Sequence, residues 1–454
     1  MTATLIPSEA PVAARVSVAR AYRFELVKLL AQWRVRLLIL ACWIGPGIAV
    51  AVVSQQASLP ADTLFGRWMH ATGWAGALVV LGFAGNWVLP LITSVVAGDV
   101  FSSEDRLGTW RHLLVAVRSP RRIFIAKALA SLSVLFVLVA GMAISGIVGG
   151  IAGIGSRPLV GLDGHLLSPG DAFGNVLLAW VCVLAPTLAL AAIGLLGSVA
   201  LGRSPMGLLL PAFAGIVLQL AQALPMPAAV RLALPSYAFL SWNGLFTGPQ
   251  QLGPLLAGSA VSLTWAVTAT AMAYLLFVRR DFTSMANDGS VRRVITFGVL
   301  PLAGVLAVSA GVLAGATGAT GSGIEQDKVQ QSLATEFGHL YRLQSGELYH
   351  LNVTEAQLRV TASCGKGGSP TSASGGPGND WRCTVSWHLP GVNDATGQAI
   401  YQLDVNPNGR YVADGDGPQE VNGYFMLHTS AGDAPNPLWQ FDGLVDLLAP
   451  TSKG

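Results

Sequence analysis

Long apolar runs alternate with short polar segments over roughly the first two thirds of the chain. The runs cover residues 37–54, 74–97, 123–152, 174–201, 206–224, 254–278 and 294–317. A helix that crosses a bilayer needs about 20 mostly apolar residues, so each run is close to the length of one span. The pattern predicts seven spans, and thus an α-helical multi-pass membrane protein with a six-span core (37–278) and a further segment (279–317) carrying the seventh span.

The overall composition agrees with this pattern. Hydrophobic residues make up 52% of the chain and charged residues only 11%, whereas a soluble protein carries about 25% charged residues. Arg outnumbers Lys, and Ala and Gly are abundant, which is typical of a bacterial genome rich in G and C. The composition excludes a soluble globular protein and predicts no binding to nucleic acid.

Basic residues are distributed unevenly between the two sides of the predicted spans. One side has seventeen Arg and Lys residues, in the N-terminal segment and in the loops after the second, fourth and sixth spans. The other side has three, Arg67, Arg157 and Arg231. Because cytoplasmic loops are enriched in Arg and Lys, the difference predicts a cytoplasmic N-terminus and, after seven spans, an extracytoplasmic C-terminal region of a plasma-membrane protein.

Residues 1–36 precede the first span and contain the pattern of an amphipathic helix over 15–36. The apolar side of this helix has Val18, Tyr22, Leu26, Leu29 and Trp33. A helix of this kind lies in the headgroup plane of the membrane, and the alternative is a cytoplasmic extension of the first span. Residues 1–14 lack such a pattern, and we expect them to be disordered.

The chain beyond the last span, residues 318–454, changes character and predicts a small extracytoplasmic α+β domain after a flexible linker (318–326). Its first helix is indicated by apolar Val329, Leu333, Phe337, Leu340 and Tyr341. Alternating segments at 357–362, 382–388 and 398–405 predict strands, and the sequences NPNG and ADGDGP predict turns.

Two of the four cysteines lie in this polar region. Cys364 and Cys383 flank a Gly-, Ser- and Pro-rich stretch, residues 365–380, which we expect to be mobile. A pair of cysteines in a polar extracytoplasmic region predicts a disulfide, with two unrelated thiols as the alternative. Cys42 and Cys182 lie inside apolar runs and are interpreted as buried hydrophobic residues.

No catalytic motif is present in the chain. The sequence has no phosphate-binding GxxxxGK[ST], no HExxH and no GxSxG, and its seven histidines have no metal-ligand spacing. Inside the predicted spans polar residues are few, namely Asn86, Asn175, Gln219 and Gln222, and none of these four is ionisable. Ion-driven transporters use buried carboxylates or histidines there, so any transport would be powered from outside this chain.

The most charged segment between two spans is residues 98–127, GDVFSSEDRLGTWRHLLVAVRSPRRIFIAK. A charge at mid-bilayer costs roughly 2.5–3.5 kcal/mol, so this segment lies at a membrane face. Its residues follow the order Glu104, Gly108-Thr109, Leu113-Leu114, Ser119-Pro120-Arg121 and Lys127. This order, between the second and third spans, resembles the ABC-2 type permease family, the membrane subunits of ATP-driven exporters.

The resemblance implies that transport and ATP hydrolysis are carried out by different subunits. It implies that residues 98–122 form a coupling helix that docks on a separate cytoplasmic ATP-binding subunit, which holds ATP and Mg²⁺; this chain needs no cofactor. The implied contact residues are Glu104, Asp105, Arg106, Gly108, Thr109, Arg111, Arg118 and Arg121. The helix at 15–36 would be the elbow helix of the family, and the broken apolar segment 225–250 would be its outer re-entrant hairpin. The seventh span and the C-terminal domain depart from the family pattern.

The function expected from this resemblance is export of a hydrophobic or amphipathic compound, in a dimer with a second permease copy or paralogue and in contact with membrane lipid. Candidate residues of the substrate path are Asn86, Trp87, Tyr237 and Trp242. Tyr237 and Trp242 could equally anchor the protein at the membrane interface. A different class of function is a membrane-anchored receptor or sensor whose outer domain binds a ligand, and a third is a membrane enzyme acting on lipids.

Overall fold

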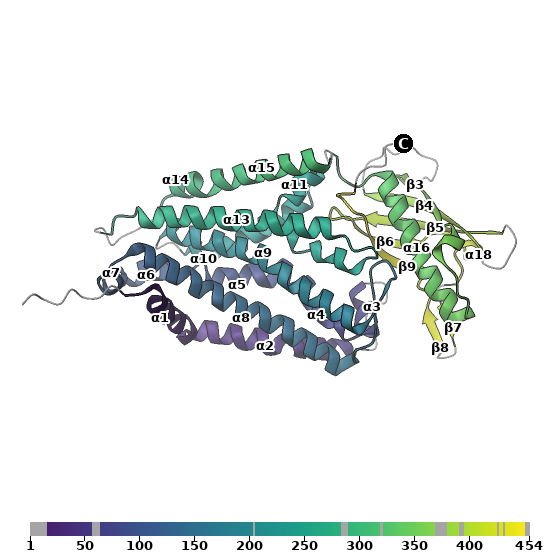
Figure 1. Cartoon of the computed structure of the whole chain (residues 1–454), viewed down its shortest axis with the longest axis horizontal. Helices are drawn as coiled ribbons and strands as arrows, with labels where there is room; N and C mark the ends of the chain where they lie inside the picture. Colours follow the sequence, from purple (N-terminus) through teal and green to yellow (C-terminus); the bar gives the residue numbers. More distant parts are fainter. Residues whose placement is uncertain are drawn as a thin grey trace, which may run out of the picture.

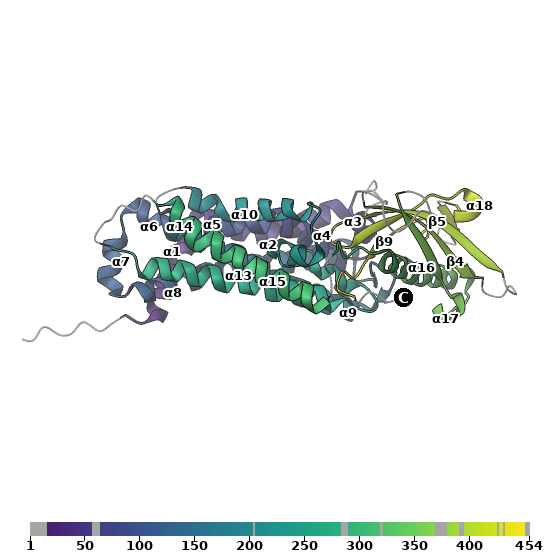
Figure 2. The ribbon, with the colours of Figure 1, turned by 90° about the horizontal axis from the view of Figure 1, so that it is seen from above.

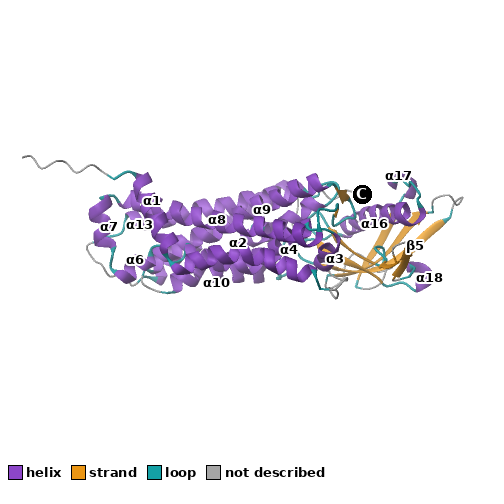
Figure 3. Ribbon diagram, turned by 90° about the horizontal axis from the view of Figure 1, so that it is seen from below, coloured by secondary structure: helices purple, strands orange, loops and turns teal. Residues whose placement is uncertain are grey.

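The computed structural model combines a bundle of long helices with a sheet domain at one end (Figure 1). It describes residues 16–56, 64–202, 205–282, 289–317, 321–367, 379–389, 395–424, 426–429 and 432–449. The long helices of the bundle and the sheet lie in separate parts of an elongated molecule, and α16, α17 and α18 lie with the sheet (Figure 3). The predicted fold class, a helical multi-pass membrane protein with a small C-terminal sheet domain, is confirmed. The predicted disordered tail and most of the predicted mobile loop lie outside the described residues.

Among the described residues, six helical segments are long and apolar enough to cross a membrane. They are α2 (Trp33–Ser54), Trp74–Val96, α8 (Pro120–Ile154), α9 (Pro169–Leu201), α13 (Leu252–Val278) and Val291–Ala316. The fifth predicted span corresponds to a shorter apolar helix, α10 (Met206–Gln222). With a rise of about 1.5 Å per residue, its 17 residues fall slightly short of the bilayer core of about 30 Å.

Two of these segments are composite. Trp74–Val96 consists of α4 (Trp74–Phe83), the π-helical turn η1 (Ala84–Val88) and α5 (Leu89–Val96). The last segment consists of α14 (Val291–Val294), η3 (Ile295–Val299) and α15 (Leu300–Thr317). Such π-helical turns interrupt the regular helix and are frequent at functional sites.

Small residues let the helices of the bundle approach closely, as is usual in membranes. A Cβ on Gly149 of α8 would lie 2.5 Å from the Cα of Gly47 on α2. At the same contact the backbone N–H of Gly47 donates to the Ser145 hydroxyl at 2.8 Å. A larger side chain at either glycine would therefore separate α2 from α8.

The bundle has two distinct ends (Figure 2). At the end that we call the basic end lie α1 (Val18–Ala31), α6 (Ser102–Leu107) and α7 (Trp110–Val117). At the opposite end, the domain end, lie α3 (Leu64–Ala71), the β-hairpin of β1 (Leu159–Val160) and β2 (Leu166–Leu167), and the sheet domain. Residues 225–250 fold there into α11 (Ala228–Leu232), α12 (Pro235–Ala238) and the 3-10 helix η2 (Ser241–Phe246).

The C-terminal domain is an antiparallel sheet covered on one face by a long helix, α16 (Gln326–Tyr349). The strand order is β3-β4-β5-β6-β9, with β3 (Thr361–Lys366), β4 (Asp380–His388), β5 (Thr396–Val405), β6 (Arg410–Gly415) and β9 (Gln440–Leu444). The predicted apolar stripe of α16 packs on inward-facing residues such as Trp381, Tyr401 and Leu403. The predicted disulfide is confirmed, because Cys364 and Cys383 are bonded at facing positions of β3 and β4.

The smaller elements of the domain are two helices and a hairpin, and one of them corrects the prediction for residues 357–362. They are α17 (Glu355–Leu358), α18 (Gln419–Asn422), β7 (Met426–Thr429) and β8 (Gly432–Pro435). Gln357 belongs to α17, because Thr354 and Gln357 form a capping box that starts a helix there. The ADGDGP turn is also partly wrong, since its first three residues end β6.

Candidate functional site

The charged segment after α5 forms the tip of the basic end. It is not one continuous helix over 98–122, because Gly108 separates α6 from α7 with φ 66°. Glycine adopts this left-handed conformation without strain, and its N–H caps α6 by donating to the carbonyl of Glu104. A second left-handed residue, Arg118, ends α7 before α8 begins. The segment is therefore two short helices at a fixed angle.

Glu104 lies inside this tip and is fully buried. Its Oε1 accepts a hydrogen bond of 2.7 Å from Nζ of Lys127, which also donates to Glu25 at 2.9 Å. Lys28 and Thr109 donate to the same carboxylate. Removing one partner of a buried ion pair destabilises a protein by about 3–5 kcal/mol, so this cluster joins α1, α6 and α8 firmly.

The pKa of Glu104 reflects these contacts. Burial alone would raise it, but the charge of Lys127 and the hydrogen bonds from Lys127, Lys28 and Thr109 outweigh burial and lower the pKa to about 2. The carboxylate is therefore ionised throughout the physiological pH range.

The neighbouring carboxylates extend the same cluster. Asp105 accepts a hydrogen bond from the indole of Trp110 at 2.8 Å and pairs with the guanidinium of Arg280, at the end of α13. Arg280 also lies 5.5 Å above the Trp110 ring. Asp99 pairs with Arg34 of α2 at 2.6 Å, so every acidic residue of the tip links it to another helix.

The eight predicted contact residues for an ATP-binding subunit thus separate into two groups. Glu104 and Asp105 are buried and Thr109 is half-buried. The exposed members are Arg106, Gly108, Arg111, Arg118 and Arg121. Two large apolar side chains lie among them, Leu107 and Val115, which are 71% and 69% exposed. The tip therefore presents a basic and apolar surface, the tip surface, and keeps its acids inside.

Sequence reasoning missed three residues of this cluster, Glu25, Lys127 as a buried charge, and Arg280. The spans were read as free of ionisable groups, yet Lys127 lies within α8 and is 1% exposed. Glu25 is found on the buried side of α1 with Ala21 and Leu29. The position of the Glu25 carboxylate within the apolar stripe of an amphipathic helix was the sequence signal that could have revealed its burial. The predicted stripe also included Trp33, which starts α2 instead and is 74% exposed.

The four candidate residues of a substrate path do not share one surface. Asn86 lies in η1 and accepts a hydrogen bond of 2.9 Å from Gln219 of α10. Trp87 beside it is 64% exposed. Tyr237 is buried in the core cluster of the C-terminal domain, and Trp242 is buried against Phe246.

At the domain end, the loop between α8 and α9 contacts the sheet domain through a buried aspartate and a histidine. Asp163, in the β1–β2 turn, accepts hydrogen bonds from the backbone N–H groups of His165 and Gly248. Its Oδ2 lies 3.2 Å from Nδ1 of His339, whose Nε2 lies 3.3 Å from Glu355. Burial opposes ionisation of both groups, but their mutual contacts prevail: the pKa of Asp163 is lowered and that of His339 is raised.

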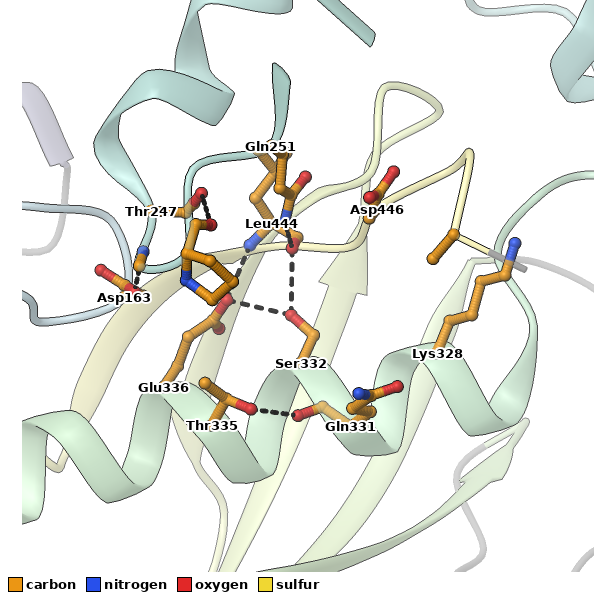
Figure 4. Close-up of a pocket in the computed structure, with 13 residues that line it drawn as sticks. Asp163, Thr247, Gln251, Lys328, Gln331, Ser332, Thr335, Glu336, Leu444 and Asp446 are labelled. Atoms are coloured by element: carbon orange, nitrogen blue, oxygen red, sulfur yellow. Dashed lines mark hydrogen bonds between the residues drawn. The ribbon is translucent and has the colours of Figure 1, made fainter. Parts of the chain in front are cut away.

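A cavity of about 200 Å³ lies next to this pair, lined by residues of the bundle loops and of α16 and β9 (Figure 4). Ser332 donates to Glu336 at 2.9 Å and to the carbonyl of Leu444 at 3.1 Å. Burial raises the pKa of Glu336 well above its usual value, despite hydrogen bonds from Tyr411, Leu444 and Ser332. Within the described part of the chain, no group of three His, Cys, Asp or Glu side chains is placed to hold a metal ion.

The fold and the tip define a multi-pass membrane transport component. Residues 22–202, from α1 through α9, match the model of the family described as ABC-2 family transporter protein. No curated protein matches the chain. Permeases of this family work with an ATP-binding subunit in general, and the matched region includes the whole tip.

Proposed function

We propose that the chain is the permease subunit of an ATP-driven exporter, and that its ATP-binding subunit docks on the tip surface. The observation that carries the proposal is the separation of charges at the tip. Its acids are buried and paired with other helices, while arginines and two large apolar side chains face outward. Exposed apolar side chains beside arginines are typical of protein interfaces.

The buried cluster supports a mechanism for transmitting force. A displacement of α6 and α7 by the ATP-binding subunit reaches α8 through Lys127, α1 through Glu25 and α13 through Arg280. Paired buried charges resist separation, so these helices move together with the tip. In this mechanism Glu104 and Asp105 do not contact the ATP-binding subunit; they join α6 and α7 to the other helices of the bundle.

The orientation proposed for the protein follows from the same charges. The arginines of the tip, of α1 and of the α13–α14 connection gather at the basic end, which we place in the cytoplasm. The sheet domain then lies outside the plasma membrane. Its disulfide supports this placement, because disulfides persist in oxidising compartments.

The proposed cargo is a hydrophobic or amphipathic compound moved outward by a dimer of permease subunits. The polar pair at η1, Asn86 and Gln219, is uncharged, which suits an apolar cargo better than an ion. The adjacent Trp87 and Leu91, together with Phe213 of α10, are about 60% exposed. These side chains supply a surface for lipid or for a second permease copy.

The test compares docking with coupling in complexes that contain an ATP-binding subunit. Val115→Glu and Arg111→Glu alter the tip surface, and we expect each to weaken retention of the ATP-binding subunit by at least about tenfold, since losing one buried apolar contact is worth about 1.5–3 kcal/mol. Glu104→Gln alters the buried cluster, and we expect normal docking with loss of substrate-stimulated ATPase activity. Arg23→Glu, an exposed arginine of α1, is the matched control.

Normal docking in both surface variants would contradict the proposed interface. If the wild-type chain retains no ATP-binding subunit and its outer domain binds a ligand, the receptor function replaces the exporter function.

A further inference from the structure

The C-terminal domain is bound to the 225–250 segment through a buried arginine. Arg231 of α11 is 3% exposed. Its Nη1 donates to the carbonyl of Pro407, in the β5–β6 turn, at 2.6 Å, and its Nη2 donates to the carbonyl of Ser322, ahead of α16. Its Nε has no hydrogen-bond partner among the described residues. The charge is thus held by backbone carbonyls.

Further contacts surround this arginine. The N–H of Ala228 donates to the carbonyl of Gly321 at 2.9 Å. Gln251 donates to the carbonyl of Leu444 on β9 at 3.0 Å. Leu232 and Tyr237 belong to the same buried apolar cluster as the core of the sheet domain. The 225–250 segment and the domain therefore share one packed interface.

The other side of the 225–250 segment packs against three membrane helices. A Cβ on Gly258 of α13 would lie 3.1 Å from the Cβ of Ala238, and a Cβ on Gly85 of η1 would lie 3.2 Å from Phe239. Asn175 of α9 donates to the carbonyl of Leu245 at 3.0 Å. A compound leaving the bundle between these helices has to displace the segment.

The domain also holds a second element of the bundle, the α8–α9 loop, through Asp163 and His339. It therefore bridges the loop and the 225–250 segment. If the segment moves alone, the contacts of Arg231 break. If the domain moves with the segment, the contact between Asp163 and His339 breaks.

We propose that the C-terminal domain is a clamp that holds the 225–250 segment against the bundle, with Arg231 as its positioning residue, and that release of this clamp accompanies export. The proposal rests on the proposed function. Among the described residues Arg231 has no acidic partner. A buried charge of this kind regains hydration when exposed, so the contact of Arg231 is suited to reversible opening.

The first experiment measures opening without ATP. Ala229→Cys, at a position of α11 that is 2% exposed, is labelled with a membrane-impermeant maleimide in a background where Cys42 and Cys182 are alanine. We expect Arg231→Ala to speed labelling at least about tenfold and Arg231→Lys to give an intermediate rate. Arg359→Ala, an exposed arginine of the domain, is the control. An unchanged rate in Arg231→Ala would overturn the clamp.

The second experiment closes the clamp covalently. A Cβ on Gly253 of α13 would lie 3.9 Å from the Cβ of Leu448 in the C-terminal segment, within the range of disulfide geometry. We expect the disulfide between Gly253→Cys and Leu448→Cys to suppress the fast labelling caused by Arg231→Ala. Such suppression would also show that the Arg231→Ala protein is folded. In complexes we expect the crosslink to stop export while docking persists, and reductant to restore export.

Each single cysteine variant controls for the substitutions and for reductant; the native disulfide is shielded, since Cys364 and Cys383 are fully buried. Export at the normal rate in the crosslinked protein would refute the need for release. Failure of the proposed function would instead appear as a wild-type chain that docks no ATP-binding subunit, whatever the labelling rates.

Discussion

The basic end and the domain end of the bundle both bury charges, but they compensate them differently. At the basic end, Glu104 and Asp105 are paired with the cations Lys127 and Arg280. At the domain end, Arg231 is held by carbonyls, and Asp163 is paired with a histidine that titrates. Full pairing favours helices that move as one body, whereas neutral or titratable partners favour contacts that open. The difference separates a transmitting end from a releasing end.

The largest expected effect comes from breaking the pairing at the basic end. Lys127→Met leaves Glu25 and Glu104 buried without their shared cation, and we expect destabilisation of about 3–5 kcal/mol. Thermal unfolding of the purified protein measures this effect. Adding Glu25→Gln and Glu104→Gln to Lys127→Met should recover most of the stability, and a triple variant no more stable than Lys127→Met would refute the role of pairing.

A second, smaller effect concerns the angle between α6 and α7. Gly108→Pro cannot adopt φ 66° and removes the N–H that caps α6, at an expected loss of about 3 kcal/mol. We expect membrane insertion to persist while coupled ATPase activity is lost. Gly108→Ala keeps the N–H and costs about 1–3 kcal/mol for its positive φ, so it should retain part of the activity. Full activity in the proline variant would argue against a rigid tip.

At the domain end, the same comparison predicts a dependence on pH. The pKa of His339 is raised, so its stabilising contact is complete below about pH 6.5 and is lost as pH rises through the pKa of the folded state. The pKa of Asp163 is lowered, so its contribution is complete above about pH 3.9 and is lost as pH falls through its folded-state pKa. The contact is therefore strongest between these values.

Hydrogen exchange of α16 at pH 6 and pH 9, corrected for intrinsic rates, measures this loss, and we expect faster opening at pH 9. His339→Gln should remove the difference. Since Glu355, Arg342 and His165 also face the pair, Arg342→Gln serves as the control. A difference that persists without His339 would assign the pH dependence to another group.

The smallest expected effect concerns Trp87. Because this side chain is 64% exposed, Trp87→Ala should change the free energy of unfolding by less than about 0.5 kcal/mol, whereas Trp242→Ala, in the buried core, should cost about 3–5 kcal/mol. If Trp87 lines the cargo path, substrate-stimulated ATPase activity falls although stability is unchanged. Unaltered stimulation would assign Trp87 to lipid or to the dimer contact.

Local patterns were enough to predict most of the fold. Apolar runs located the membrane helices, the apolar stripe of α16 located the first helix of the domain, and two cysteines located a disulfide. The site was less accessible, because the sequence does not state whether Glu104 points inward or outward. The approach of Lys127 from α8 and of Lys28 from α1 determines its burial. The contact between Arg231 and Pro407 joins residues 176 positions apart, which no local pattern reveals.

The last membrane helix packs least among the six apolar segments of the described residues, followed by α2 with 11% of its apolar window buried. Only 6% of the apolar window of Val291–Ala316 is buried, against 67% for α9. This helix leads to the sheet domain and contributes only partly buried side chains, such as those of Leu302 and Val305, to the core of the bundle. Removal of this helix would therefore leave the contacts that join α1, α2, α8, α9 and α13 to one another in place.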